Sequence, residues 1–397
     1  MTSAIFDSCE VHRLRWGHNT ALIVLETKAS DGTSGLGEAS MSGNDVAVVE
    51  HIKNMFASIL QGRSVDEIQA MTGILAHLAV DSKSFVMATA ASALEQSLWD
   101  IRGQMLNLPI CSIIGDVKTT TIPLYANINR VPGERTPEAF AGQAVLAKEA
   151  GFRAVKCAPF DEVLPEPSDD NQVVQTGMER LRAIRAAIGT DVDLMVDCHG
   201  RLGVQRALGI AEELKELSIK WLEEPVVTNE EMWRVIRRRS PMFGQHSGTD
   251  FEGLSSVARA AGVPLAGGEF EVGLAQFSDL LSLDAIRFVM PDVKHCGGIG
   301  VAAEVAMMAG AKGVMMSPHN PSGPISALGS AHVAAISPTL DSLETAWGEL
   351  LPDQGLIEPA LDIRSGNLDM PSGPGLGARL VQQTVERLRI PFDATKW

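Results

Sequence analysis

Residues 193–200, DLMVDCHG, and 219–225, IKWLEEP, decide the fold of this chain. Each is a short apolar run, typical of a buried strand, that ends in acidic side chains. Six similar runs are TIPLYANI (121–128), FRAVKCAP (152–159), VPLAGGE (263–269), AIRFVMPD (285–292), GVMMSPHN (313–320) and SLETAW (342–347). Amphipathic helical stretches such as TPEAFAGQAVLAKEAG (136–151) and GMERLRAIRAAIG (177–189) lie between them. Such βα repeats predict a (β/α)8-type barrel.

A doubly wound open sheet is the alternative arrangement for the same repeats. We favour the barrel because polar residues follow nearly every predicted strand. A barrel builds its active site at the carboxyl ends of its strands, on the loops that follow them.

The region before the repeats has a different pattern. Residues 20–40, TALIVLETKASDGTSGLGEAS, predict antiparallel strands with turns at residues 31–32 and 35–37. Helices are predicted over about 45–61, 64–77 and 84–104. We therefore divide the chain into an α+β domain (1–120), the barrel (121–350) and a Gly/Pro-rich tail (351–397) that packs back on the first domain.

The composition limits the functional classes. The chain has 397 residues, a net charge of −16 and a pI near 5.0, which argues against a nucleic-acid partner. Its five cysteines show no CxxC spacing and are expected to be free thiols. No signal-like N-terminus or membrane-length apolar run occurs, so we expect a cytoplasmic protein without a membrane partner.

Three acidic residues follow successive predicted strands: Asp197, Glu223 and Glu269. Neighbouring strands lie about 4.8 Å apart, so these carboxylates should converge. A hard divalent cation would neutralise such a cluster, and oxygen ligands without cysteine favour Mg²⁺ or Mn²⁺ over Zn²⁺. Taken singly, each acid could equally be a solvated loop residue; three in succession predict a metal site.

The next two strands end in Asp292 and His319, which should therefore touch. An aspartate orients an imidazole and makes it a competent general base. Glu344 ends the last predicted strand and, if protonated, could donate a hydrogen bond to a developing enolate. Taken alone, His319 would be read as a structural histidine and Glu344 as a surface acid.

Two further residues should point into the active-site opening at the carboxyl ends of the strands. His199 lies two residues after Asp197, so strand alternation predicts that both point to one face. Lys156 ends the second barrel strand and is the nearest candidate to balance a substrate carboxylate, or else has a structural role in the barrel. The same alternation turns Cys157 toward the helices.

With GLGEAS (35–40), SALEQSLWDIRGQ (92–104) and PSGPGLG (371–377), these motifs make the whole chain resemble the enolase superfamily, in its mandelate racemase-like branch. The resemblance implies a modified (β/α)7β barrel beneath an α+β capping domain. It implies Mg²⁺ on Asp197, Glu223 and Glu269, an Asp292–His319 base dyad, and Glu344 beside the enolate. Capping loops near residues 16–20 and 40–44 should close over the substrate. A dimer-based homo-oligomer, commonly an octamer, is also implied.

Two departures from the branch bear on the reaction. Its frequent Lys-x-Lys motif is Lys156-Cys157-Ala158 here, so the second lysine base is missing. Its frequent Asp-x-Asn motif is Asp197-Cys198-His199, which resembles galactonate and mannonate dehydratase-like members, where the histidine serves as acid. We therefore favour a sugar-acid dehydratase that acts on a small-molecule carboxylate and yields a 2-keto-3-deoxy acid.

Two other functions stay open. A racemase, epimerase or lactone cycloisomerase would use the same enediolate without losing water. A non-catalytic binding barrel would be expected to lack metal ligands, and none of the three is missing. The connection between Glu223 and Glu269 is also about twenty residues longer than a βα unit needs. It includes RRRSPMFGQHSGTDF (237–251), which would lie on the active-site side as a lid or an oligomer contact, whereas Arg237–Arg239 alone is better explained as a solvated helix end.

Overall fold

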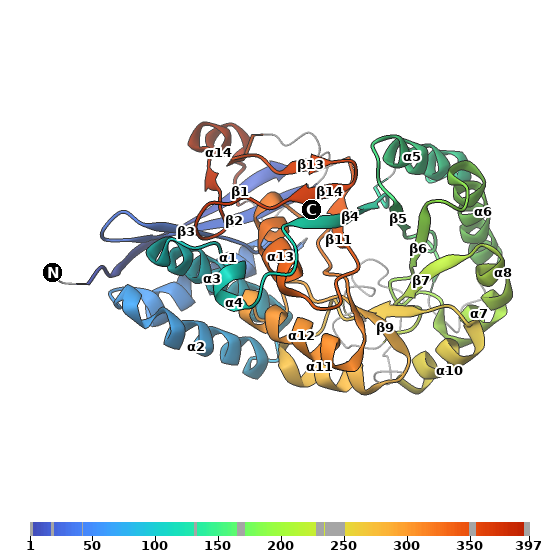
Figure 1. Cartoon of the computed structure of the whole chain (residues 1–397), viewed down its shortest axis with the longest axis horizontal. Helices are drawn as coiled ribbons and strands as arrows, with labels where there is room; N and C mark the ends of the chain where they lie inside the picture. The colour runs from blue at the N-terminus through green and yellow to red at the C-terminus, as the bar shows by residue number, and fades with distance from the viewer. Residues whose placement is uncertain are drawn as a thin grey trace.

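The computed structural model describes residues 3–16, 20–41, 43–130, 133–164, 171–227, 234, 251–348 and 355–392. It has a capping domain at the left of Figure 1 and a barrel at the right. The longer part of the predicted insertion, including residues 237–239, lies outside the described residues. So do residues 17–19 and 42 of the two capping loops.

The capping domain is an antiparallel sheet covered by helices. Strands β1 (Phe6–Trp16), β2 (Thr20–Ala29) and β3 (Ser34–Glu38) pair in sequence order. Helices α1 (Asp45–Met55), α2 (Ile68–Asp81) and α3 (Phe85–Leu106) supply apolar side chains to one core with β2. A π-helical turn (Phe56–Leu60), a 3-10 turn (Val65–Glu67) and α4 (Cys111–Ile114) complete this region.

The predicted turn at residues 35–37 is wrong, because Gly35 and Gly37 lie inside β3. Their role is to let α3 approach the sheet. A Cβ atom at Gly35 would lie 2.1 Å from the Ser97 carbonyl oxygen, and one at Gly37 would lie 2.0 Å from that of Ala93. The glycines therefore mark a close helix–strand contact rather than a chain reversal.

The second domain is a closed parallel barrel. In the described residues its strands are β4 (Thr121–Asn127), β5 (Ala154–Cys157), β6 (Asp193–Asp197), β7 (Ile219–Glu223), β8 (Leu265–Gly267), β9 (Ile286–Val289), β10 (Met315–Met316) and β11 (Leu343–Ala346). They pair in chain order from β4 to β10, and β11 pairs with β4. A parallel bridge from Met316 to Leu340 joins β10 to the chain entering β11 and closes the ring.

Helices connect the barrel strands and cover the outside of the ring, as Figure 1 shows. They are α5 (Pro137–Glu149), α6 (Asn171–Ile188), α7 (Gly203–Gly209), α8 (Ala211–Glu216), α10 (Phe251–Ala261), α11 (Gly273–Ser282), α12 (Ile299–Lys312) and α13 (Pro324–Ile336). Within the described residues this domain ends on strand β11, with no further barrel helix after it. The modified (β/α)7β barrel with an α+β cap is thereby confirmed.

The barrel interior is filled by side chains. A compact apolar cluster contains Tyr125, Met195, Trp221, Phe288 and neighbours, and the Tyr125 and Trp221 rings meet edge to face at 5.6 Å. Trp221 Nε1 donates to Glu223 Oε2 at 3.1 Å. This apolar cluster therefore holds Glu223, one of the acids predicted to bind metal, in a fixed position.

The tail returns to both domains. Strands β12 (Ile357–Glu358) and β15 (Arg379–Leu380) form a small ribbon, and β13 (Asp362–Arg364) pairs with β14 (Asn367–Asp369). Strand β14 also pairs antiparallel with β4, while α14 (Gln382–Leu388) packs against β1. In Figure 1 the tail lies above the cap sheet and next to β4.

No helix in the described ranges is long and apolar enough to cross a membrane. All five cysteines are free.

A buried histidine ties α13 to the tail and should make stability pH-dependent. His332 Nδ1 accepts from the Cys111 backbone N–H at 3.2 Å, and its Nε2 lies 3.3 Å from the Leu376 carbonyl oxygen. Both bonds are satisfied by one neutral tautomer. Burial lowers the pKa of His332 from 6.5 to about 4. The unfolded chain therefore takes up a proton first as the pH falls below 6.5, and the folded state loses stability until about pH 4.

We expect this group to contribute about 3 kcal/mol to the pH dependence of unfolding. Urea unfolding of wild type and His332→Gln at pH 7 and pH 4 measures it. The stability difference between the two proteins should narrow by about that amount at the lower pH. A difference that is the same at both pH values would contradict the assignment of a neutral buried ring.

Candidate active site

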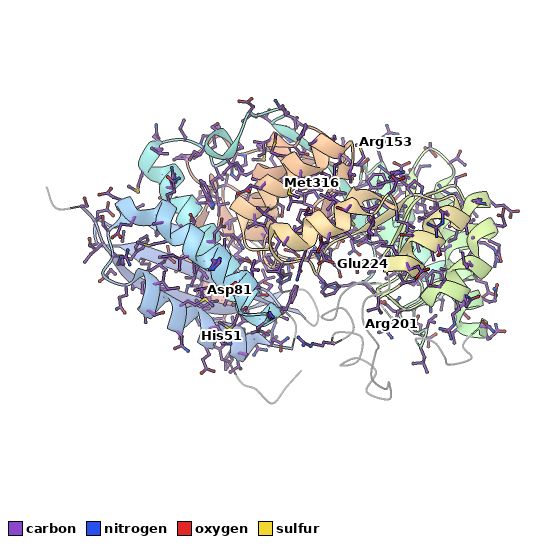
Figure 2. The ribbon with its side chains drawn as sticks, turned by 90° about the horizontal axis from the view of Figure 1, so that it is seen from below. His51, Asp81, Arg153, Arg201, Glu224 and Met316 are labelled. Atoms are coloured by element: carbon purple, nitrogen blue, oxygen red, sulfur yellow. The ribbon has the colours of Figure 1, made fainter. Side chains whose placement is uncertain are left out.

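The predicted metal ligands lie at or just after neighbouring strand ends. Asp197 and Glu223 are the last residues of β6 and β7 and are paired in register. Glu269 follows the end of β8 by two residues. All three are at least nine-tenths buried. Glu224, the neighbour of Glu223, is also buried, and Figure 2 shows it on the barrel side of the molecule, away from His51 and Asp81 on the cap helices.

Lys156 lies among the buried carboxylates and contacts two of the predicted ligands as well as Glu344. Its Nζ lies 2.8 Å from Glu223 Oε1, 3.1 Å from Glu344 Oε1 and 3.4 Å from Asp197 Oδ2. The side chain is completely buried, and the three carboxylates hold the pKa of Lys156 well above its usual value despite that burial. In this structure Lys156 therefore compensates the acid cluster, which is the structural role that the sequence left open beside a contact with a substrate carboxylate.

One lysine does not neutralise the cluster. Burial and the nearby Asp197 raise the pKa of Glu223 from 4.5 to about 8. Burial and Glu269 likewise raise the pKa of Glu224, which is strained with a φ of 42°. The site thus carries more buried carboxylate than its own cations can stabilise.

The predicted base dyad is in contact. His319 Nδ1 lies 2.8 Å from Asp292 Oδ2, and its Nε2 lies 2.7 Å from Glu269 Oε2. Although burial disfavours the charged ring, Glu269 and Glu344 keep the pKa of His319 well above its usual value. The imidazole is therefore oriented by Asp292 and presents Nε2 to the acid cluster.

Sequence reasoning missed two partners of Asp292. Lys294 donates to it through both its backbone N–H, at 2.8 Å, and its ammonium group. His295 approaches Asp292 and also lies 2.9 Å from Thr89 Oγ1 on α3, which links the dyad to the capping domain. The short spacing Asp292-Val293-Lys294-His295 was the available signal.

His199 reaches the site by a different route from the one predicted. Strand β6 ends at Asp197, and His199 has a left-handed backbone with a φ of 47°, so strand alternation does not orient it. Its Nε2 nevertheless lies 3.1 Å from Asp197 Oδ2, and its Nδ1 lies 2.6 Å from Asp161 Oδ1. Against the effect of burial, Asp197 and Asp161 raise the pKa of His199 well above 6.5. Cys157 lies in the outer core between strands and helices, as expected.

Glu344 could donate a hydrogen bond only if it were protonated, and this structure does not meet that condition. Its carboxylate accepts from Asn127 Nδ2 at 2.6 Å and from the Asn320 backbone N–H at 2.9 Å. Burial alone would raise the pKa of Glu344, but Lys156 and His319 outweigh it and hold the pKa below its ordinary value. The group is therefore an ionised acceptor at the edge of the cluster.

The donor set fits a hard divalent cation. Glu269 Oε2 and Glu224 Oε2 are buried, and neither has a donor in good hydrogen-bond geometry within the described residues. Together with Asp197 and Glu223 they form a buried cluster of carboxyl oxygens without cysteine, which suits Mg²⁺ or Mn²⁺. The three predicted ligands have different ion-pair partners in this structure: Glu269 pairs with His319, whereas Asp197 and Glu223 share Lys156.

A different trio is more compact. Among the described residues, the His/Cys/Asp/Glu group with ligand atoms all within 4.8 Å is Glu10, His12 and Glu26 on the cap sheet. Lys28 Nζ already lies 2.8 Å from Glu10 and 3.2 Å from Glu26. Arg389 lies 3.2 Å from His12 Nδ1, and because arginine only donates, the proton of a neutral ring stays on Nε2. We interpret this trio as an ion-pair cluster.

Two family descriptions match the chain. "Mandelate racemase / muconate lactonizing enzyme, N-terminal domain" covers residues 14–115, and "Enolase C-terminal domain-like" covers 139–244 and 245–384. Together they span the cap, the barrel and much of the tail.

Curated relatives extend over most of the chain. A D-gluconate dehydratase from Thermoproteus tenax is 27% identical over 381 residues, covering 94% of this chain and 71% of that protein. A D-galactonate dehydratase from Xanthomonas euvesicatoria pv. vesicatoria is 25% identical over 372 residues, covering 92% of this chain and 90% of that protein.

Solved structures share the fold. A mandelate racemase/muconate lactonizing enzyme from Jannaschia sp. CCS1 has a TM-score of 0.82 at 22% identity, covering 98% of both chains. A mandelate racemase/muconate lactonizing enzyme-like protein from Roseovarius sp. TM1035 has the same TM-score at 24% identity, covering 97% of this chain and 95% of that one.

Proposed function

Because the chain belongs to the mandelate racemase/muconate lactonizing enzyme branch of the enolase superfamily, we propose that it is a Mg²⁺-dependent dehydratase of a sugar acid. The names of its relatives suggest an aldonate as the substrate class. The product would be the corresponding 2-keto-3-deoxy acid. The observation that supports this best is the pair of histidines beside one acid cluster, His319 at Glu269 and His199 at Asp197.

The proposed cation ligands are Asp197, Glu223 and Glu269. When bound, Mg²⁺ would compensate these carboxylates and stabilise the negative charge that develops on the substrate carboxylate. Lys156 holds Asp197 and Glu223 in place from the buried side, and Trp221 fixes the second oxygen of Glu223. The protein thus supplies a rigid set of oxygens.

The two histidines divide the proton transfers. His319 acts in its neutral form, which would be favoured when Glu269 turns from Nε2 to the cation and no longer raises the pKa of the ring. Nε2 then takes the proton from the carbon next to the carboxylate, and Asp292 stabilises the imidazolium that results. The electron pair of that C–H bond moves toward the carboxylate and then forms a C2–C3 double bond as the C3–O bond breaks. His199 gives its proton to the departing oxygen, which leaves as water, and the enol becomes the keto acid.

The test is incubation of the purified protein with Mg²⁺ and a panel of aldonic and aldaric acids, with keto acid detected by semicarbazide. We expect keto acid from at least one aldonate, and none after EDTA treatment. Proton exchange in D₂O without keto acid on lactones or cyclic acids would favour the isomerase instead. If neither keto acid release nor proton exchange is detected, the proposed function is overturned.

A further inference from the structure

His199 is clamped by two carboxylates of different kinds. Asp197 belongs to the acid cluster and lies beside Nε2 at 3.1 Å. Asp161 lies outside that cluster, on the loop after β5, and contacts Nδ1 at 2.6 Å. Both Asp161 and the ring are about a quarter exposed, at 28% and 25% of their side-chain surface, so solvent reaches part of each.

Asp161 is itself held in position. Arg135, on the loop after β4, donates to the Asn129 and Ala158 carbonyl oxygens at 2.9 and 2.6 Å. These bonds fix the guanidinium group, whose Nη2 lies 3.6 Å from Asp161 Oδ2. The loops after β4, β5 and β6 are therefore joined through Arg135, Asp161 and His199.

The contact with Asp161 determines which ring nitrogen of His199 is free to transfer a proton. A carboxylate that accepts from Nδ1–H fixes the tautomer and the ring plane, and it leaves Nε2 as the nitrogen that faces the reaction. The left-handed backbone of His199 releases its ring from strand geometry, so a side-chain partner has to set its direction. Within the described residues, Asp161 is the Nδ1 partner.

We infer that Asp161 is a positioning residue for the dehydration step, holding His199 so that Nε2 delivers the proton to the departing hydroxyl. The inference rests on the proposed function. It predicts that loss of Asp161 impairs departure of the hydroxyl but not removal of the α-proton, because His319 and Asp292 do not contact it. The carbanionic species would then be reprotonated more often than it eliminates.

The experiment compares Asp161→Asn with wild type, with Asp161→Glu as the conservative variant. Asp161→Asn should lower kcat for keto acid release by about 10–100-fold. KM should stay within about threefold of wild type, and deuterium from D₂O should enter the α-position of the remaining substrate. Asp161→Glu should recover part of kcat. Asp191→Asn is the matched control, since it removes an exposed carboxylate that pairs with Lys148 and contacts neither Arg135 nor His199, and it should stay close to wild type.

Three outcomes would overturn the inference. They are an unchanged kcat in Asp161→Asn, an equal loss of exchange and elimination in that variant, and an equal loss of kcat in Asp191→Asn. If wild type dehydrates none of the acids, the proposed function fails by itself. The positioning is then measured in metal-free protein as the rate of diethyl pyrocarbonate modification of His199. It should rise several-fold in Asp161→Asn, and an equal rate would overturn the positioning.

Discussion

Asparagine in place of His319 is expected to lower kcat/KM for dehydration by about 10²–10⁴-fold, the contribution of a positioned general base. Nε2 of His319 faces the acid cluster while Nδ1 is fixed on Asp292, so the ring is the group placed to remove the α-proton. The same variant should also stop α-proton exchange in D₂O. Keto acid release and exchange are measured on the same samples by semicarbazide and proton NMR.

The pattern across variants identifies the base. His319→Asn should lose exchange and elimination together, whereas Asp161→Asn should lose elimination alone. His77→Asn is a suitable control, because His77 is an exposed residue paired with Asp81 on a cap helix. Exchange that continues at the wild-type rate in His319→Asn would show that another group removes the proton.

The barrel was predictable because its signal is repeated. Helical stretches lie between the apolar runs, and the structure has a strand within each of the predicted runs. The exact ends were not predictable. Glu269, Asp292 and His319 lie beyond the hydrogen-bonded strands, on the loops that enter the site. Such residues keep the order of the barrel but not the alternation of a strand, which is why the parity argument for His199 failed.

Local patterns also have more than one physical cause. Gly35 and Gly37 resembled a turn, yet they serve the close packing of α3 on β3, a contact with residues 93 and 97 that no short window contains. In the same way, the ionised state of Glu344 depends on Lys156, which is distant in the sequence. Charge states are set by three-dimensional neighbours, so they could not be predicted from strand ends.

Asp161 was missed for a related reason. It follows β5 within APFDEV (158–163), where two acids at a loop start resemble an ordinary solvated segment. Its importance appears only when Arg135 and His199 arrive from the neighbouring loops. An acid a few residues beyond a barrel strand was the available signal, and the sequence contained too many of these to select one.

Replacing Glu223 by Gln should remove most of the Mg²⁺ affinity, because it deletes a proposed ligand while keeping the size of the side chain. In wild type, Mg²⁺ at 100 times its Kd should stabilise the folded state by about 2.7 kcal/mol, since the ion binds the native site and not the unfolded chain. The shift is measured by thermal unfolding with and without Mg²⁺, and Mn²⁺ binding is measured directly by electron paramagnetic resonance. Glu223→Gln should lose both effects and release no keto acid.

The cap trio provides the control for this experiment. Glu10→Gln changes the more compact acid–histidine group, which we interpret as an ion-pair cluster around Lys28. It should keep the Mg²⁺ shift, Mn²⁺ binding and keto acid release of wild type. Loss of metal binding in Glu10→Gln, with binding retained in Glu223→Gln, would move the cation to the cap sheet. The barrel carboxylates would then need another source of positive charge, and the dehydratase mechanism proposed for them would fail.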